Sequence, residues 1–215
     1  MKTKGITMAL IFAMSFTYGF SQNINTKSNN SKEDTFTYRK FSVSTTYLSL
    51  LNFGSEKTNT HHYEFHVGYK LTSKDKIGIK IATWKMFAPM GMPMKEQLKF
   101  DESNFYPGRL RETGFGISYQ RMLWKGLFAT IEILPQLKTY IGEDDKKIGN
   151  GFKLYTSYHL GYHISFFKDK MFIEPQIHCQ YWPIDTNTPQ IFKEFDSKWN
   201  NYFLFEPNLY IGVNF

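Results

Sequence analysis

The sequence lacks several features that define common classes of enzyme and of disulfide-stabilised protein. Its 215 residues contain a single cysteine, Cys179, which excludes an internal disulfide framework. No phosphate-binding loop, dinucleotide fingerprint or Cys-x-x-Cys pair occurs. Beyond the N-terminus, no stretch reaches 18 uninterrupted apolar residues, so no membrane-spanning helix is predicted there. The formal net charge is +7 without a long basic run, and we therefore expect no nucleic-acid partner.

The first 21 residues have the pattern of a secretory signal peptide. Two lysines precede a mostly apolar stretch at residues 6–20, and Gly19 and Ser21 supply small residues near the predicted cleavage point, after Ser21. Residues 22–39 are rich in Asn, Ser, Thr and Lys, which predicts a flexible periplasmic leader. By length, residues 40–215 form a single domain.

Eight segments of alternating apolar and polar residues follow the leader, and this alternation predicts strands with one apolar face. The segments are residues 40–50, 61–71, 76–87, 111–123, 127–140, 151–167, 171–183 and 200–215. In the last segment, the apolar face holds Phe203, Phe205, Pro207, Leu209, Ile211, Val213 and Phe215. Largely polar residues alternate with them, as expected for a strand between lipid and a polar interior.

The connections between these segments alternate in length. The short connections are residues 72–75, 124–126 and 168–170, and the longer ones are residues 51–60, 88–110, 141–150 and 184–199. Short periplasmic turns and longer extracellular loops are typical of transmembrane β-barrels. We therefore predict an all-β fold, an eight-stranded antiparallel transmembrane β-barrel. A soluble lipocalin-like barrel or a sandwich is the alternative that period-two alternation leaves open.

The last strand, ending in Phe215, resembles the C-terminal strand of outer-membrane β-barrel proteins of Gram-negative bacteria. In size and layout the chain resembles the small eight-stranded barrels of the OmpA/OmpX type. This resemblance implies location in the cell outer membrane, contact with outer-membrane lipid and lipopolysaccharide, and recognition of Phe215 by the barrel-assembly machinery. Aromatic residues near the segment ends, including Trp84, Trp124 and Trp182, are expected to form girdles at the two rims.

Three prolines fall inside predicted strands, each shortly after a glutamate that alternation places in the interior. They are Pro135, Pro175 and Pro207, after Glu132, Glu174 and Glu206. Proline lacks the N–H that a sheet requires, so bulges or kinks are expected at these positions.

The predicted interior is rich in charge. It combines Glu64, Glu112, Glu132, Glu174 and Glu206 with Lys70, Lys80, Lys138 and Lys153, and with His62, His66, His159, His163 and His178. An eight-stranded barrel is just wide enough to be filled by side chains, and buried charges have to be paired. We expect a charge-compensated plug, and no metal site or cofactor.

One group of interior residues has the chemistry of a hydrolase. His163 and Ser165 share the inner face of the sixth segment, and a two-residue turn at Lys168-Asp169 would place Glu174 opposite His163. A carboxylate, an imidazole and a hydroxyl are the components of acyl transfer. The His-x-Ser pair loosely resembles outer-membrane lipid A deacylases, although here it points inward near the predicted periplasmic side.

The longest predicted loop carries Met90, Met92 and Met94. Thioethers are soft ligands that suit Cu(I), so a copper site is one interpretation. Packing of the loop on itself or on a partner is the other, because methionine fills irregular gaps.

These features favour a non-enzymatic outer-membrane protein with a structural, adhesive or partner-binding role through its external loops. An extracellular or cell-envelope protein would be the partner. The alternatives are a lipid-modifying hydrolase that uses His163, Ser165 and Glu174, and a narrow channel.

Overall fold

The computed structural model describes residues 39–53, 55 and 58–215. The predicted signal peptide at residues 1–21 lies outside the described residues, as does the predicted leader at residues 22–39 apart from Arg39. Among the described residues, none of the helices has the length and apolar character needed to cross a membrane.

Antiparallel strands make up most of the described chain. They are β1 (Phe41–Thr46), β2 (Tyr63–Lys70), β3 (Asp75–Met86), β4 (Arg109–Trp124), β5 (Leu127–Ile141), β6 (Lys147–Tyr162), β7 (Ile164–Phe166), β8 (Met171–Thr186) and β9 (Tyr202–Asn214). Short helical segments occupy three of the connections: η1 (Tyr47–Phe53), α2 (Met94–Gln97) with η2 (Glu102–Asn104), and α3 (Gln190–Asp196).

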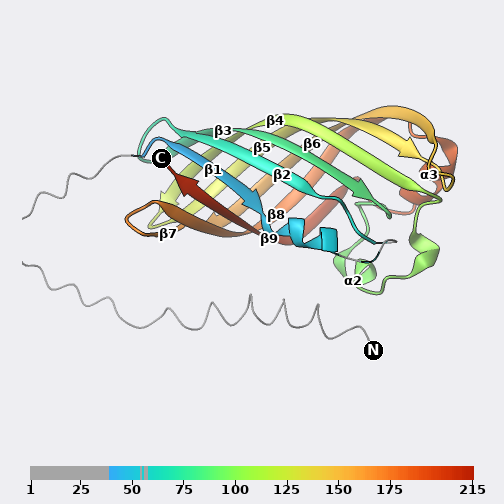
Figure 1. Ribbon diagram of the computed structural model, residues 1–215, viewed down its shortest axis with the longest axis horizontal. Helices are drawn as coiled ribbons and strands as arrows, with labels where there is room; N and C mark the ends of the chain where they lie inside the picture. The colour runs from blue at the N-terminus through green and yellow to red at the C-terminus, as the bar shows by residue number, and fades with distance from the viewer. Residues whose placement is uncertain (1–38, 54, 56–57) are drawn as a thin grey trace, which may run out of the picture. The chain divides into compact units, whose positions relative to one another are not determined.

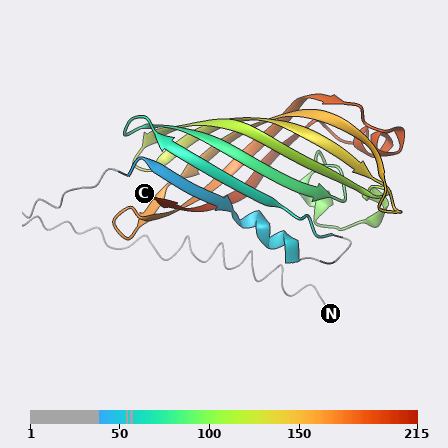
Figure 2. The same cartoon turned by 45° about the horizontal axis from the view of Figure 1, so that its top comes forward.

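The sheet closes on itself to form a barrel. Its order is β6-β5-β4-β3-β2-β1-β9-β8-β7, and β6 also pairs with β8. β6 and β7 act as one strand interrupted at His163, whose backbone N–H donates to the carbonyl of Gly126 at 2.8 Å. The ring therefore contains eight strands, and the predicted all-β, eight-stranded antiparallel barrel is confirmed (Figures 1 and 2). The closed ring excludes a sandwich.

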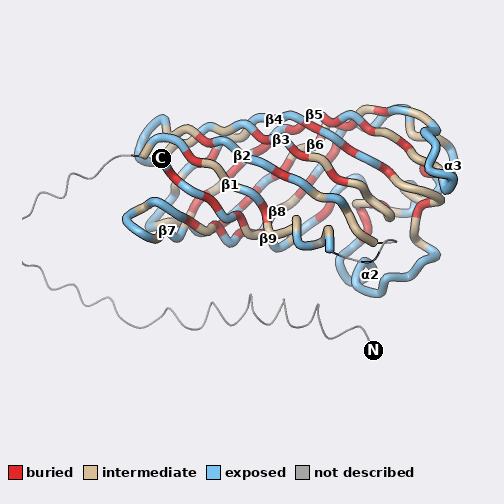
Figure 3. The backbone as a smooth tube through the Cα atoms, viewed as in Figure 1, coloured by how far each residue is buried: buried red, intermediate tan, exposed pale blue. Residues whose placement is uncertain are grey.

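The two faces of the wall have opposite character. In β5 the burial pattern alternates almost without break, and Figure 3 shows the same alternation of buried and exposed residues along the other strands. The outer face exposes large apolar side chains such as Ile117 (60% exposed), Ile131 (50%) and Ile211 (44%). The buried inner face holds charged and amide side chains, including Lys80 and Glu132.

The first strand is shorter than predicted. The alternation at residues 40–50 predicts one strand, but β1 ends at Thr46 and the chain turns into η1. The Thr46 hydroxyl donates to Oδ1 of Asn208 at 2.6 Å and accepts from the backbone N–H of Leu48 at 3.2 Å. By accepting a hydrogen bond from the N–H of Leu48 in η1, this hydroxyl stabilises the turn in which β1 ends.

The connection between β5 and β6 is also shorter than predicted. The predicted loop covers residues 141–150, whereas the two strands continue to pair up to Ile141 and Lys147. The backbone N–H of Gly142 donates to the carbonyl of Lys146 at 2.8 Å, and Asp145 has a φ of 58°. The hairpin therefore closes with a tight turn. Aspartate suits this turn because it tolerates a positive φ.

A bulge changes the facing of residues in the last strand. His178 of β8 pairs with Glu206, but Gln180 pairs with Phe203, so β9 has one extra residue at this point. Phe205 takes a φ of 59° there. Phe203, predicted on the outer face, is consequently turned inward and is only 5% exposed. The predicted irregularity next to Pro207 is confirmed, whereas Pro175 pairs in regular register with Leu209.

Trp84 and Trp182 are among the aromatic residues predicted at the rims that are buried instead. Trp84 is 6% exposed and Trp182 is 7% exposed, and both belong to one apolar cluster with Leu134 and Phe203. Trp84 lies two residues from Ala82 and four from Lys80, so strand alternation places it on the same inner face. The girdle prediction is wrong for these residues, but Trp124 is 67% exposed as expected.

Candidate functional site

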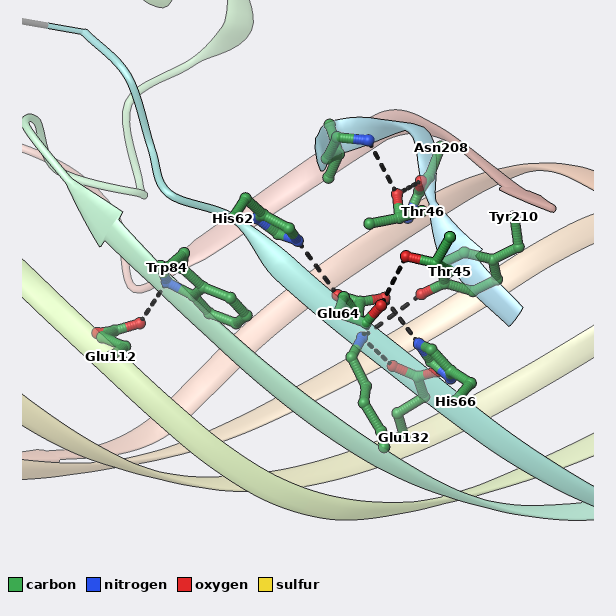
Figure 4. Close-up of polar contacts among 12 residues, drawn as sticks. Thr45, Thr46, His62, Glu64, His66, Trp84, Glu112, Glu132, Asn208 and Tyr210 are labelled. Atoms are coloured by element: carbon green, nitrogen blue, oxygen red, sulfur yellow. Dashed lines mark hydrogen bonds and ion pairs between the residues drawn. The ribbon is translucent and has the colours of Figure 1, made fainter. Parts of the chain in front are cut away.

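The middle of the barrel is occupied by one lysine shared between two glutamates. Nζ of Lys80 lies 2.8 Å from Oε2 of Glu132 and 3.2 Å from Oε1 of Glu64. All three side chains are almost fully buried, and β3, β5 and β2 contribute one each. Figure 4 shows Glu64, Glu132 and Tyr210 gathered in this part of the interior. A charge with two opposite partners is compensated without solvent, as a buried ion requires.

Histidines extend this central group. Nε2 of His66 contacts Oε1 of Glu64 at 2.7 Å, and Nε2 of His159 lies 3.4 Å from Oε2 of Glu132. The other ring nitrogen of His159 is 3.0 Å from Oε1 of Gln176. These contacts connect the group to β6 and β8, so that both halves of the wall are tied together through the interior.

A second group lies towards the end of the barrel that carries α2 and α3. Nζ of Lys153 is 2.5 Å from Oε1 of Glu112, and Nε1 of Trp84 donates to Oε2 of the same carboxylate at 3.0 Å. Lys138 is fully buried and forms an ion pair with Asp185. The predicted charge-compensated interior is therefore present at both levels.

One cavity between these side chains is small. A cavity next to Glu132 and Glu174 has a volume of about 30 Å³. A single water molecule needs on the order of 10–15 Å³ of such volume, so the cavity has room for very few. The filled interior is a plug.

We expect the barrel not to conduct ions, because paired side chains occupy its interior. Planar-bilayer recording with the purified protein is the appropriate measurement, with an open porin as positive control. The predicted trace shows no stable steps. Reproducible steps of constant size would favour the narrow-channel hypothesis.

The structure brings together two of the three predicted hydrolase residues. Nδ1 of His163 lies 2.9 Å from Oε1 of Glu174, as the predicted hairpin register requires. Ser165 is exposed two residues further on, in β7. Within the described part of the chain, no hydrogen bond joins Ser165 to His163. The acid–base pair exists, but its nucleophile is not engaged.

The Glu174 carboxylate has structural partners besides His163. Nε2 of Gln120 donates to Oε1 of Glu174 at 3.1 Å, and Nζ of Lys76 lies 3.5 Å from the same oxygen. On the other side of the ring, Nε2 of His163 is 3.9 Å from Oδ1 of Asp169 in the turn. The group therefore connects three strands and a turn at the end of the barrel opposite α2 and α3.

The structure contains a second serine–histidine pair that the sequence does not predict. Oγ of Ser157 lies 2.7 Å from Nε2 of His159, and both side chains are almost completely buried. Their two-residue spacing on the inner face of β6 is the signal that could have identified them. Because no substrate-sized space adjoins them among the described cavities, they belong to the plug.

Replacing Ser165 with alanine should leave the acyl composition of lipid A unchanged, because no general base among the described residues forms a hydrogen bond with the hydroxyl. Mass spectrometry of lipid A from cells with the wild-type and variant proteins is the measurement. Normal folding of the variant together with loss of an acyl-chain change would instead establish the hydrolase.

The three loop methionines lie in different surroundings. Met92 is 3% exposed, Met94 begins α2 and is 37% exposed, and Met90 packs on the apolar cluster of Trp84 and Trp182. Met90 therefore packs on the barrel, and Met92 is buried. Among the described residues, no group of three or more His, Cys, Asp or Glu side chains could hold a metal ion.

An open cleft lies between the β3–β4 connection, residues 87–108, and the β8–β9 connection, residues 187–201. Its volume is about 510 Å³, which falls in the range of small-ligand sites, roughly 300–1,000 Å³. The floor includes Trp182 and Lys153, and the walls include Tyr106 and Trp199. None of the residues predicted as catalytic lines this cleft.

Tyr106 and Asp196 join the two connections across the cleft. The Tyr106 hydroxyl donates to Oδ1 of Asp196 in α3. Burial raises the pKa of the Asp196 carboxyl above its ordinary value. Burial also raises the pKa of Tyr106 well above its usual range, and the nearby Asp196 carboxylate adds to this shift. Tyr106 therefore stays a neutral donor at physiological pH.

No family profile matches this chain, and no curated protein matches it in sequence. Among solved structures, the crystal structure of Neisserial surface protein A is similar in fold. It is 10% identical, and the alignment covers 82% of this chain and 94% of that chain with a TM-score of 0.41. At this level of similarity no functional residue is transferred.

Proposed function

We propose that this chain is an outer-membrane β-barrel protein whose barrel is plugged and whose larger connections bind a partner outside the cell. The exposed apolar outer face around a closed ring carries this proposal. A soluble barrel has the opposite arrangement, because water disfavours large contiguous apolar surfaces. A bilayer solvates such a face and requires that every backbone group be paired, as in a closed ring.

The outward apolar face supports the proposed lipid partners, and the resemblance of the last strand to those of outer-membrane barrels supports the proposed assembly machinery. Outer-membrane lipid and lipopolysaccharide would contact the outward residues, and the assembly machinery would read Phe215. The end with α2 and α3 would face outward, since external loops are the longer ones in such barrels. An extracellular or envelope molecule would then meet residues 87–108 and 187–201.

The hydrolase is the weaker candidate. The His163–Glu174 contact favours it, but Ser165 is not engaged and the ring faces the turn at Asp169. A structural role accounts for these contacts, because His163 lies near the carboxylates of Glu174 and Asp169, and Gln120 donates a hydrogen bond to Glu174.

Fractionation of cells expressing the full chain tests the proposal. The protein should be recovered with the outer membrane, and its gel migration should change on boiling, since closed barrels resist detergent until heated. Recovery in the soluble periplasmic fraction, with migration unaffected by boiling, would contradict it.

A further inference from the structure

The cleft between the β3–β4 and β8–β9 connections has the features of a preformed ligand site. A side chain at Gly91 could not be accommodated, because its Cβ would lie 1.9 Å from the carbonyl oxygen of Asn200. The backbone N–H of Trp182 donates to the carbonyl of Asn201 at 3.1 Å. Together with the Tyr106–Asp196 hydrogen bond, these contacts fix the two walls relative to the floor.

The charges around the cleft cancel. Lys153 and Lys193 line it together with Asp185 and Asp196. Lys153 is already neutralised by Glu112 at 2.5 Å, and Asp185 is paired with Lys138. Lys193 is the remaining lysine of the lining, and Asp196 in the same helix offsets its charge, so the arrangement favours a neutral ligand.

Trp199 supplies both an aromatic surface and an unused donor. Its indole Nε1 is buried without a hydrogen-bond partner among the described residues. Leaving a buried donor unpaired is unfavourable, so a ligand oxygen that reached it would be favoured. The amides of Asn187 and Asn200 also line the cleft and supply donors and acceptors.

We infer that this cleft binds a neutral carbohydrate, with a sugar ring packed on Trp199 and its hydroxyls bonded to the indole N–H and the nearby asparagine amides. Sugars combine an apolar ring face with many hydroxyls, which matches an aromatic wall beside amide groups. An acyl chain would leave the indole N–H and the asparagine amides of the cleft without hydrogen-bond partners. An extended peptide would need a free strand edge, and Trp182 is already paired to Asn201.

This inference rests on the proposed outward orientation of the cleft and specifies the class of ligand. Titration of the purified, folded full chain with maltotriose, cellotriose or triacetylchitotriose tests it. Binding is followed by calorimetry and tryptophan fluorescence. The detergent has to be lauryldimethylamine oxide, since a sugar-headed detergent would compete for the cleft. Decanoate serves as the acyl-chain probe and glucose 6-phosphate as the anionic one.

Saturable binding of at least one neutral oligosaccharide is the expected result. Trp199→Phe keeps an aromatic ring but removes the N–H donor, and it should weaken binding by about five- to tenfold. Trp199→Ala should weaken it further. Trp124→Ala is the control, because Trp124 is 67% exposed and lies at the other end of the barrel.

Absence of saturable binding for all three oligosaccharides would overturn the inference, as would binding that Trp199→Ala leaves unchanged. Saturation by decanoate or by glucose 6-phosphate alone would overturn it too. Each variant is first checked for heat-modifiable migration, so that a misfolded protein is not scored. A folded outer-membrane barrel that binds no sugar contradicts this inference alone, whereas a soluble protein contradicts the proposed function.

Discussion

Replacing Lys80 with methionine should destabilise the barrel by roughly 3–5 kcal/mol, the usual cost of removing one partner from a buried ion pair. Methionine has a similar length and no charge, so the change isolates the electrostatic loss. Glu64 and Glu132 would remain buried with the shared ammonium removed, and the Tyr210 hydroxyl would lose a contact at 3.4 Å. Urea unfolding of the detergent-solubilised protein, followed by heat-modifiable migration, measures the difference.

Two further variants make this result interpretable. Lys147→Met changes an exposed lysine at the start of β6 and should shift the free energy of unfolding by no more than about 0.5 kcal/mol. Adding Glu132→Gln to Lys80→Met should recover part of the lost stability, because it removes one buried carboxylate left without its ammonium partner. A Lys80→Met protein as stable as the wild type would refute the central ion group.

Replacing Phe215 with alanine should sharply reduce the amount of assembled barrel in cells, because the assembly machinery is expected to read this aromatic residue. The backbone N–H of Phe215 donates to the carbonyl of Phe41 at 2.9 Å, and the Phe41 N–H donates back at 3.0 Å. Both bonds survive the substitution. Only the ring, which stacks on Phe41 at 6.0 Å, is lost. Quantitative immunoblotting of outer-membrane fractions gives the measurement.

Phe115→Ala is the matched control, since Phe115 and Phe215 are both 58% exposed on the outer face. We expect near-normal assembly of this control. Refolding of the Phe215→Ala protein into detergent should also remain near normal, because the seam between β1 and β9 keeps its backbone pairing. Unaltered insertion in cells would remove the proposed role of Phe215.

The strands and their facing were largely predictable because period-two alternation is a local signal. The same alternation, with one hairpin register, also predicted that His163 would meet Glu174, and the structure confirms that contact. Alternation further places Trp84 and Trp182 on the inner face. The girdle prediction was wrong here because it relied on the preference of aromatic residues for the membrane interface. It did not consider which face of the strand each residue occupies.

What could not be predicted depends on contacts between residues far apart in the sequence. Phe203 faces inward because of a bulge opposite Cys179. Pro207 predicted an irregularity nearby, but not the position of the extra residue or its effect on the facing of Phe203. β1 ends at Thr46 because the hydroxyl finds Asn208 on β9. The cleft requires two connections, residues 87–108 and 187–201, to meet, and their sequences carry no period that would place one against the other.

The most direct test of the membrane-embedded barrel is the environment of its outer face. Nitroxide labels are placed singly at Ile117, Ile131 and Ile211 in a Cys179→Ala protein reconstituted into liposomes, with Asp144 in the β5–β6 turn as control. We expect collisions with lipid-soluble oxygen but not with water-soluble nickel chelate at the three isoleucine positions, and the reverse at residue 144. Equal access of the nickel chelate to all four positions would contradict it.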